Sequence, residues 1–136
     1  MYHARRPGGT RDELRFCTRR SATDPWSSPA PVPLGAATDR SDKDPTISSD
    51  ARILVFASTR GGEGSLLELW WTSRRDGNPA TPWETPQPIG RTVNGSRPTY
   101  APTLSSDGDT IYFATLGRSG GAGKSELWLS RRVRKK

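Results

Sequence analysis

A short string near the end of the chain has the residue types of a hydrolase nucleophile. Gly117-Arg118-Ser119-Gly120-Gly121 fits the G-x-S-x-G pattern, in which the serine stands on a turn between a strand and a helix and a histidine follows downstream. The only histidine is His3, far upstream, and the string is followed by Glu126-Leu127-Trp128-Leu129, a run typical of a strand. We therefore expect a connection between two strands and no catalytic residue in this chain.

Two further patterns have features of phosphate or metal sites. Gly123-Lys124-Ser125 matches the end of a phosphate-binding loop, but Gly117 is one position too far away, and a strand lacks the helix N-terminus that such a loop needs. Closely spaced carboxylates occur in two runs, which are Asp39, Asp42 and Asp44, and Asp107 and Asp109. Neither run has the glycine and glutamate positions of a helical calcium loop. We expect neither a cofactor nor a metal site.

Tryptophans and paired arginines recur at matching positions along the chain. The tryptophans are Trp26, Trp70, Trp83 and Trp128, and the arginine pairs are 19–20, 74–75 and 131–132. We expect the indole rings to pack between neighbouring structural units. The arginine pairs, each at the end of an expected strand, are interpreted as a solvated edge that its charge protects from aggregation. A basic arc for an anionic partner is the alternative.

A repeat positions all of these residues. The segment that begins at Asp44 returns from Ala101 onward, and Phe56 and Phe113 stand 57 positions apart within it. A fixed period of this size indicates that one supersecondary unit is stacked, because a single unit cannot bury its apolar face alone. The repeat therefore defines the architecture more than the chemistry.

Alternating apolar residues between turn signals predict four antiparallel strands in the middle unit. The expected strands are 45–48, 53–58, 67–73 and a proline-rich outer strand at 85–89, joined by turns at 49–52 and 76–79 and a glycine-rich loop at 60–64. In the third unit, Asp107-Gly108 is expected to form a hairpin turn. Alternation also selects the core, which comprises Ile47, Leu54, Phe56, Leu69, Trp70 or Trp71, Leu104, Ile111, Phe113 and Leu127.

The composition supports short strands and turns. The 136 residues include 14 Gly, 12 Pro and 5 Trp with 31% apolar residues, which favours strands over helices and argues against disorder. Cys17 is the single cysteine, so no internal disulfide forms. The formal net charge is +7, but no known aromatic-basic module is present, which disfavours nucleic-acid binding. Neither a signal peptide nor a membrane span is expected.

Three strings of the repeat resemble the TolB-type, tryptophan-aspartate-like β-propeller family: Pro-Thr-Leu-Ser-Ser-Asp-Gly at 102–108, Ile-Tyr-Phe-Ala-Thr at 111–115 and Glu-Leu-Trp-Leu-Ser-Arg at 126–131. The proline-rich segment at 82–90 resembles the bacterial envelope and extracellular subgroup. The resemblance implies an all-β fold, a partial β-propeller of about two and a half four-stranded antiparallel blades. Its parts are a partial first blade at 1–43 with strands b, c and d, a complete blade at 44–100, and a last blade at 101–136 with strands a, b and c and a basic tail.

The family also suggests a role. It implies a non-catalytic repeat segment, the C-terminal part of a larger propeller, that binds a protein or glycan partner or acts as a scaffold, with self-association through open blade faces. The candidate binding residues are Asp44, Thr46, Arg60, Tyr100, Thr103 and Arg118. For a longer chain with a signal, the resemblance implies the periplasm or cell envelope. The alternative function is the propeller portion of a peptidase or glycosidase-like hydrolase whose catalytic domain is absent from this chain.

Overall fold

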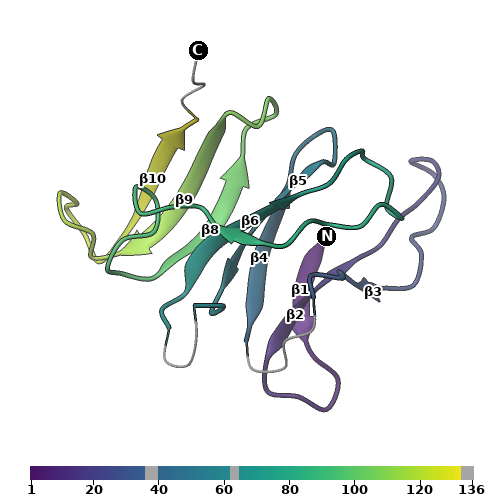
Figure 1. The fold of residues 1–136 in the computed structure, drawn as a ribbon, viewed down its shortest axis with the longest axis horizontal. Coiled ribbons are helices and arrows are strands. Elements are labelled where there is room, and N and C mark those ends of the chain that lie inside the picture. The colour runs from purple at the N-terminus through teal and green to yellow at the C-terminus, as the bar shows by residue number, and fades with distance from the viewer. Residues whose placement is uncertain (36–39, 62–64, 133–136) are drawn as a thin grey trace.

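The computed structural model describes residues 1–35, 40–61 and 65–132. In these residues the protein has ten strands and no helix, arranged as three antiparallel sheets of three, four and three strands that lie side by side in chain order (Figure 1). The expected all-β class is confirmed. Among the described residues, no helix of the length and hydrophobicity needed to cross a membrane is found. The predicted features at Asp39, at 62–64 and in the tail from 133 lie outside this part of the chain.

Each sheet consists of strands that follow one another in the chain. The first sheet contains β1 (Tyr2–Arg5), β2 (Asp12–Phe16) and β3 (Ala30–Pro31). The second contains β4 (Asp42–Ile47), β5 (Ile53–Ser58), β6 (Glu68–Ser73) and β7 (Gln87–Pro88). The third contains β8 (Thr99–Leu104), β9 (Thr110–Leu116) and β10 (Ser125–Arg131). The strands expected at 53–58 and 67–73 are confirmed, and the proline-rich β3 and β7 are short edge strands because proline has no N–H to donate.

The first strands of the second and third sheets bend at the same repeat position. The register shifts after Lys43 in β4 and after Tyr100 in β8. The next residues, Asp44 and Ala101, have φ angles of 48° and 49°, and a proline follows each. A β-bulge of this kind accommodates a proline within a strand, so β4 begins earlier than the predicted range 45–48.

The second sheet is the central layer, and its strand β5 is buried on both faces. On one face, Leu54 and Phe56 of β5 pack with Leu14 of the first sheet. On the other face, Val55 and Ala57 pack against the third sheet. All four β5 residues are at most 2% exposed. Because consecutive strand residues point to opposite faces, β5 is apolar throughout.

The predicted core is buried with one clear exception. Buried as predicted are Leu54, Phe56, Leu69, Ile111 and Phe113. Ile47 and Leu104 are half-buried, and of the two tryptophan alternatives Trp70 packs in the core whereas Trp71 is 38% exposed. The prediction for Leu127 is wrong, because this side chain is 74% exposed. The alternation of apolar residues shows which side chains share one face of a strand, but it does not show whether another sheet covers that face.

The turn after β4 and the turn after β8 each contain an aspartate with the same hydrogen bonds. Asp50 accepts a hydrogen bond at Oδ1 from Ser48 Oγ at 2.6 Å and another from the backbone two residues on. Asp107 accepts the equivalent bonds in the third sheet. The residue after each aspartate is left-handed, with φ of 57° at Ala51 and 70° at Gly108. The Asp107-Gly108 hairpin turn is therefore confirmed.

Candidate functional site

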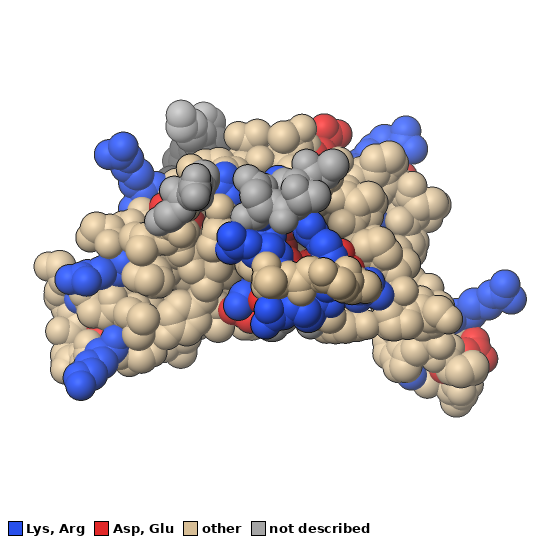
Figure 2. Space-filling view, turned by 90° about the horizontal axis from the view of Figure 1, so that it is seen from below, with Lys and Arg blue, Asp and Glu red and all other residues tan. Residues whose placement is uncertain are grey.

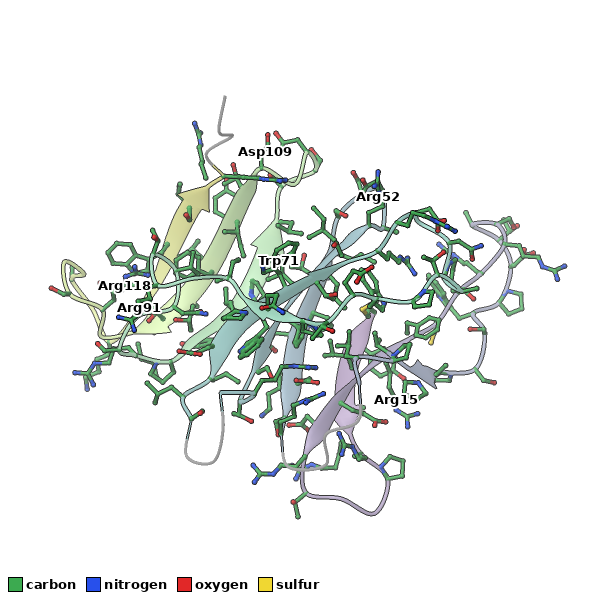
Figure 3. The ribbon with its side chains drawn as sticks, in the orientation of Figure 1. Arg15, Arg52, Trp71, Arg91, Asp109 and Arg118 are labelled. Carbon is green, nitrogen blue, oxygen red and sulfur yellow. The ribbon has the colours of Figure 1, made fainter. Side chains whose placement is uncertain are left out.

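An open groove lies between the second and third sheets, at the end of the molecule that carries the β4–β5 and β8–β9 turns. Its volume is about 910 Å³. In Figure 3, Trp71 lies toward the middle of the molecule from these two turns, which are marked by Arg52 and Asp109. We call this hollow the inter-sheet groove.

The floor of the inter-sheet groove is apolar. Its apolar residues come from β5, β6, β9 and the segment after β7, and they are Ile53, Val55, Trp71, Ile89, Val93 and Ile111. Trp71 is 38% exposed, whereas its cross-strand partner Val55 is 2% exposed. An indole ring that remains exposed at the bottom of a hollow is a common anchor for a partner side chain.

Exposed arginines stand on both sides of this groove. Arg52 and Arg75 belong to the second repeat, and Arg131 and Arg132 stand at the end of β10. Arg75 lies 3.4 Å from Asp76, and an exposed ion pair of this kind contributes little free energy. The rim therefore places positive charge beside an apolar floor.

Arg74 lines the same groove but has a structural role. Its guanidinium donates hydrogen bonds to the carbonyl oxygens of Ala51 at 2.8 Å, Asn78 at 2.8 Å and Gly77 at 3.1 Å. It also stacks over Trp83 at 4.4 Å, and the residue is 7% exposed. The interpretation of the arginine pairs as a solvated edge is therefore wrong for Arg74, which ties the β4–β5 turn to the loop after β6.

Three carboxylates, Asp50, Glu84 and Asp109, also line the inter-sheet groove. The hydrogen bonds from Ser48 and from the Arg52 backbone hold the pKa of Asp50 below its ordinary value, so this carboxylate is ionised at neutral pH. Five arginines against three carboxylates leave the lining with excess positive charge. The groove therefore favours a ligand that carries negative charge.

Four of the predicted binding residues lie elsewhere, along the seam between β4 and β8. Asp44 Oδ2 accepts a hydrogen bond from the β8 backbone at 3.2 Å, and Thr46 Oγ1 accepts another at 3.3 Å. The Tyr100 hydroxyl shares a hydrogen bond of 2.9 Å with a serine of β10, and Thr103 is exposed. Asp44 and Thr46 thus join the second sheet to the third.

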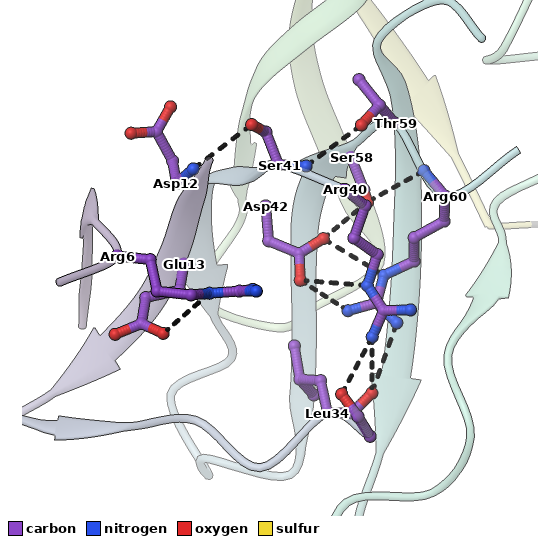
Figure 4. Close-up of polar contacts among 11 residues, drawn as sticks. Arg6, Asp12, Glu13, Leu34, Arg40, Ser41, Asp42, Ser58, Thr59 and Arg60 are labelled. Atoms are coloured by element: carbon purple, nitrogen blue, oxygen red, sulfur yellow. Dashed lines mark hydrogen bonds and ion pairs between the residues drawn. The ribbon is translucent and has the colours of Figure 1, made fainter. Parts of the chain in front are cut away.

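Arg60 belongs to a polar cluster at the opposite end of the sheets (Figure 4). Its Nη2 lies 2.7 Å from Asp42 Oδ2, and its Nε lies 3.2 Å from Asp42 Oδ1. The guanidinium stacks over Phe56 at 4.8 Å, and the side chain is 6% exposed. Burial lowers the pKa of Arg60, and the charge of Asp42 opposes that shift. The guanidinium is therefore held by partners within the protein.

Basic side chains gather at this end of the molecule, with acidic side chains among them (Figure 2). Lys43 Nζ lies 3.0 Å from Asp12, and Arg6 Nε lies 3.4 Å from Glu13. These carboxylates offset the charge of the cations beside them. The inter-sheet groove is consequently the better candidate for an anionic partner.

Arg118 follows β9 as Arg60 follows β5. It donates hydrogen bonds to the carbonyl oxygens of Thr92 at 2.5 Å and Val93 at 3.1 Å. Its guanidinium lies 5.0 Å from the centre of the Trp128 ring. Arg118 thus fastens the segment after β7 to the third sheet.

The six predicted binding residues and the inter-sheet groove are separate, because none of the six lines it. A binding role for these residues stays a prediction. The sequence signal for the groove was the recurrence of arginine pairs at 74–75 and 131–132, which the structure places around one hollow. Trp71 carried no such signal, since the corresponding position of the third sheet is Leu129.

Three of the recurring tryptophans pack as predicted, and one does not. Trp70, Trp83 and Trp128 pack against the core. Trp26 is 60% exposed, and Arg19 stacks over its ring at 4.4 Å. Trp83 packs against the buried cluster between the first and second sheets, whereas Trp26 belongs to neither buried cluster of the described residues.

The serine motif lies apart from the groove, whereas Asp109 of the carboxylate run lines it. Ser119 is exposed in the connection between β9 and β10, which joins two strands. Within residues 1–35, 40–61 and 65–132, no group of three or more His, Cys, Asp or Glu side chains is arranged to hold a metal ion.

Comparison of the chain with protein-family models, with curated proteins and with solved structures found no match. The candidate site therefore rests on the geometry of this chain.

Proposed function

We propose that the chain is a non-catalytic module of propeller-type repeats that binds an acidic protein segment in the inter-sheet groove. The observation that carries the proposal is the exposed indole of Trp71 on an apolar floor between exposed arginines. A segment with alternating apolar and acidic side chains fits this arrangement. Its apolar side chains are buried on the floor, and its carboxylates pair with the arginines of the rim. Charge pairing of this kind sets the association rate and the orientation of the partner.

Bonds between equivalent positions of neighbouring sheets support the propeller-type arrangement. Ser49 Oγ donates to Ser106 O at 2.7 Å, and these residues are 57 positions apart. The bond from Ala101 N to Asp44 spans the same number of positions. Stacked repeats bring equivalent positions together in this way.

The proposal is tested with a peptide of alternating glutamate and leucine, whose binding is measured by calorimetry. We expect Trp71→Ala to weaken binding by about tenfold or more, because a buried aromatic anchor is lost. Arg131→Glu should weaken it as well, and added salt should reduce the affinity of the unmodified protein. Arg20→Glu, an exposed arginine that does not line the groove, is the matched control.

The outcomes separate the partner classes. Absence of peptide binding, or binding that is unchanged by Trp71→Ala, contradicts the proposal. Binding of polyglucuronate, but not of the peptide, with the same dependence on Trp71 and Arg131 replaces the protein partner by an acidic glycan.

A further inference from the structure

The third sheet lacks the outer strand that the other two sheets have. In the first sheet β3 pairs with β2, and in the second β7 pairs with β6. Among the described residues, β10 pairs only with β9 (Figure 1). The other side of β10 therefore presents backbone N–H and C=O groups to which another strand can bind. We call this side of β10 the free edge.

The segments that pair with β2 and with β6 have the same sequence pattern. Residues 25–32 read Pro-Trp-Ser-Ser-Pro-Ala-Pro-Val, and residues 82–89 read Pro-Trp-Glu-Thr-Pro-Gln-Pro-Ile. The shared pattern is Pro-Trp-x-x-Pro-x-Pro followed by a β-branched aliphatic residue, and we call such a stretch a Pro-Trp segment. Proline is tolerated in an outer strand where its missing N–H would face away from the sheet.

Both Pro-Trp segments form the same two backbone hydrogen bonds. The residue after the tryptophan donates to a carbonyl beyond the middle of the strand, and the aliphatic residue donates to the carbonyl of a leucine near the start of the strand. These bonds are Ser27 N to Thr18 O at 2.8 Å, Glu84 N to Ser73 O at 2.8 Å, Val32 N to Leu14 O at 2.9 Å and Ile89 N to Leu69 O at 3.0 Å. In β10 the same positions are held by Arg131 and Leu127.

An arginine at the end of the strand stacks on the tryptophan of each segment. The guanidinium of Arg19 lies 4.4 Å from the centre of the Trp26 ring, and that of Arg74 lies 4.4 Å from the centre of the Trp83 ring. Arg132 holds this position in the third sheet and is exposed. The third sheet thus keeps the arginine, and a guanidinium over an indole ring is an attractive pair.

Two side chains of β10 also match those that contact a Pro-Trp segment in the second sheet. Thr72 Oγ1 donates a hydrogen bond of 2.6 Å to the Glu84 carbonyl, and Ser130 has a hydroxyl at the equivalent position. Ile89 packs against the buried cluster of the second and third sheets. Leu127 is 74% exposed, so it offers apolar surface to an aliphatic side chain in the position of Ile89.

We propose that the free edge binds a Pro-Trp segment of a different protein as the fourth strand of the third sheet. The segment donates two amides to the carbonyls of Arg131 and Leu127, and its indole stacks on Arg132. Bonds to the main chain supply affinity in this mode of binding, and the side-chain positions supply specificity. The proposal does not rest on the acidic segment proposed above, although Arg132 also lines the inter-sheet groove.

The probe is a synthetic peptide with the sequence of residues 80–91, and its binding to the intact chain is measured by calorimetry. We expect methylation of the peptide nitrogens at Glu84 and Ile89 to weaken binding by about tenfold or more, because both donors are lost. Methylation at Thr85, whose amide donates to no described residue, is the matched control and should leave the affinity unchanged.

A second arm of the experiment tests the stacking. Arg132→Ala in the protein should weaken binding by about fivefold, as should Trp83→Ala in the peptide. Arg20→Ala, at another exposed arginine, should bind the peptide as the unmodified chain does.

Four results would overturn the proposal. The first is absence of binding, and the second is an affinity that methylation at Glu84 and Ile89 does not change. The third is binding that depends on these amides but not on Arg132, because it places the peptide on another strand. The fourth is a dimer of the chain that the peptide dissociates in sedimentation, because a second copy then supplies the segment.

Discussion

The second and third sheets are built from the same repeat, but they differ in what surrounds them. Leu69 is fully buried, and Leu127 at the same position is 74% exposed. Phe56 and Phe113, in contrast, are buried in both sheets, at 0% and 2% exposed, because the preceding sheet covers each of them. The repeat determines the residue type at a position, whereas the neighbouring sheet determines how much that residue contributes to stability.

The arginine that follows the second strand differs between the two sheets in a related way. Arg60 is paired with Asp42 at 2.7 Å and is almost fully buried. The position equivalent to Asp42 is Thr99 in the third sheet, and Arg118 bonds to backbone carbonyls. In both sheets an arginine thus attaches the end of the second strand to the segment that precedes the sheet. The ion pair with a carboxylate is found only at Arg60 of the second sheet.

The largest expected effect comes from removing the carboxylate of this ion pair. Asp42→Ala leaves the Arg60 guanidinium buried without its counterion, and we expect a loss of about 4 kcal/mol in the free energy of unfolding. Thr99→Val in the third sheet is the control and should cost about 1 kcal/mol or less. Chemical denaturation measures both values, and equal losses would contradict the distinction between the two sheets.

A second pair of substitutions tests the role of the neighbouring sheet. Leu69→Ala should cost about 3 kcal/mol, because it leaves a cavity between two packed sheets. Leu127→Ala, measured on dilute protein, should change stability by less than about 0.5 kcal/mol. Similar costs at the two positions would show that the face of the third sheet that carries Leu127 is covered within the chain.

The turns of the two sheets offer a smaller, reciprocal test. Ala51 has a left-handed φ of 57° where the third sheet has Gly108. Ala51→Gly should stabilise the protein by up to about 1 kcal/mol, and Gly108→Ala should destabilise it by about the same amount. An added Cβ at Gly108 meets no atom within 4 Å, so backbone strain alone is measured. Changes of the same sign in the free energy of unfolding for the two variants would contradict the left-handed conformation of both positions.

The smallest expected effect is on the stability of the protein at acidic pH. Hydrogen bonds from Ser48 to Asp50 and from Thr81 to Asp76 hold the pKa of each carboxyl below its ordinary value. The unfolded chain therefore takes up protons first as the pH falls, so the contribution of these groups is complete above about pH 4 and is lost as the pH falls through the folded pKa. Asp76→Asn should reduce the fall in melting temperature on acidification. An unchanged fall would show that the carboxyl of Asp76 does not contribute.

The sequence predicted the strands where local signals agree. Alternation selected Leu54 and Phe56, and the aspartate of the 107–108 turn marked a hairpin, because both depend on residues close together in the chain. The resemblance to a propeller repeat supplied the grouping into units, which stays a proposal.

The remaining features depend on how the sheets pack. The pairing of Asp42 with Arg60 requires the register of β4 with β5, and the exposure of Trp26 and Leu127 depends on faces that no described sheet covers. The inter-sheet groove likewise arises from the spacing of two sheets. No local pattern in the sequence encodes the spacing between sheets. The sequence therefore did not predict the groove, and the six predicted binding residues lie outside it.

The most direct test of the binding site compares the two exposed tryptophans, Trp71 in the inter-sheet groove and Trp26 outside it. The measurement is a titration of the indole N–H signals in a ¹H–¹⁵N spectrum with the glutamate–leucine peptide, with signals assigned from Trp71→Phe and Trp26→Phe. The account predicts that the Trp71 signal shifts with saturable dependence on peptide while the Trp26 signal stays in place. A Trp71 signal that does not move, or a Trp26 signal that moves in its stead, would contradict it.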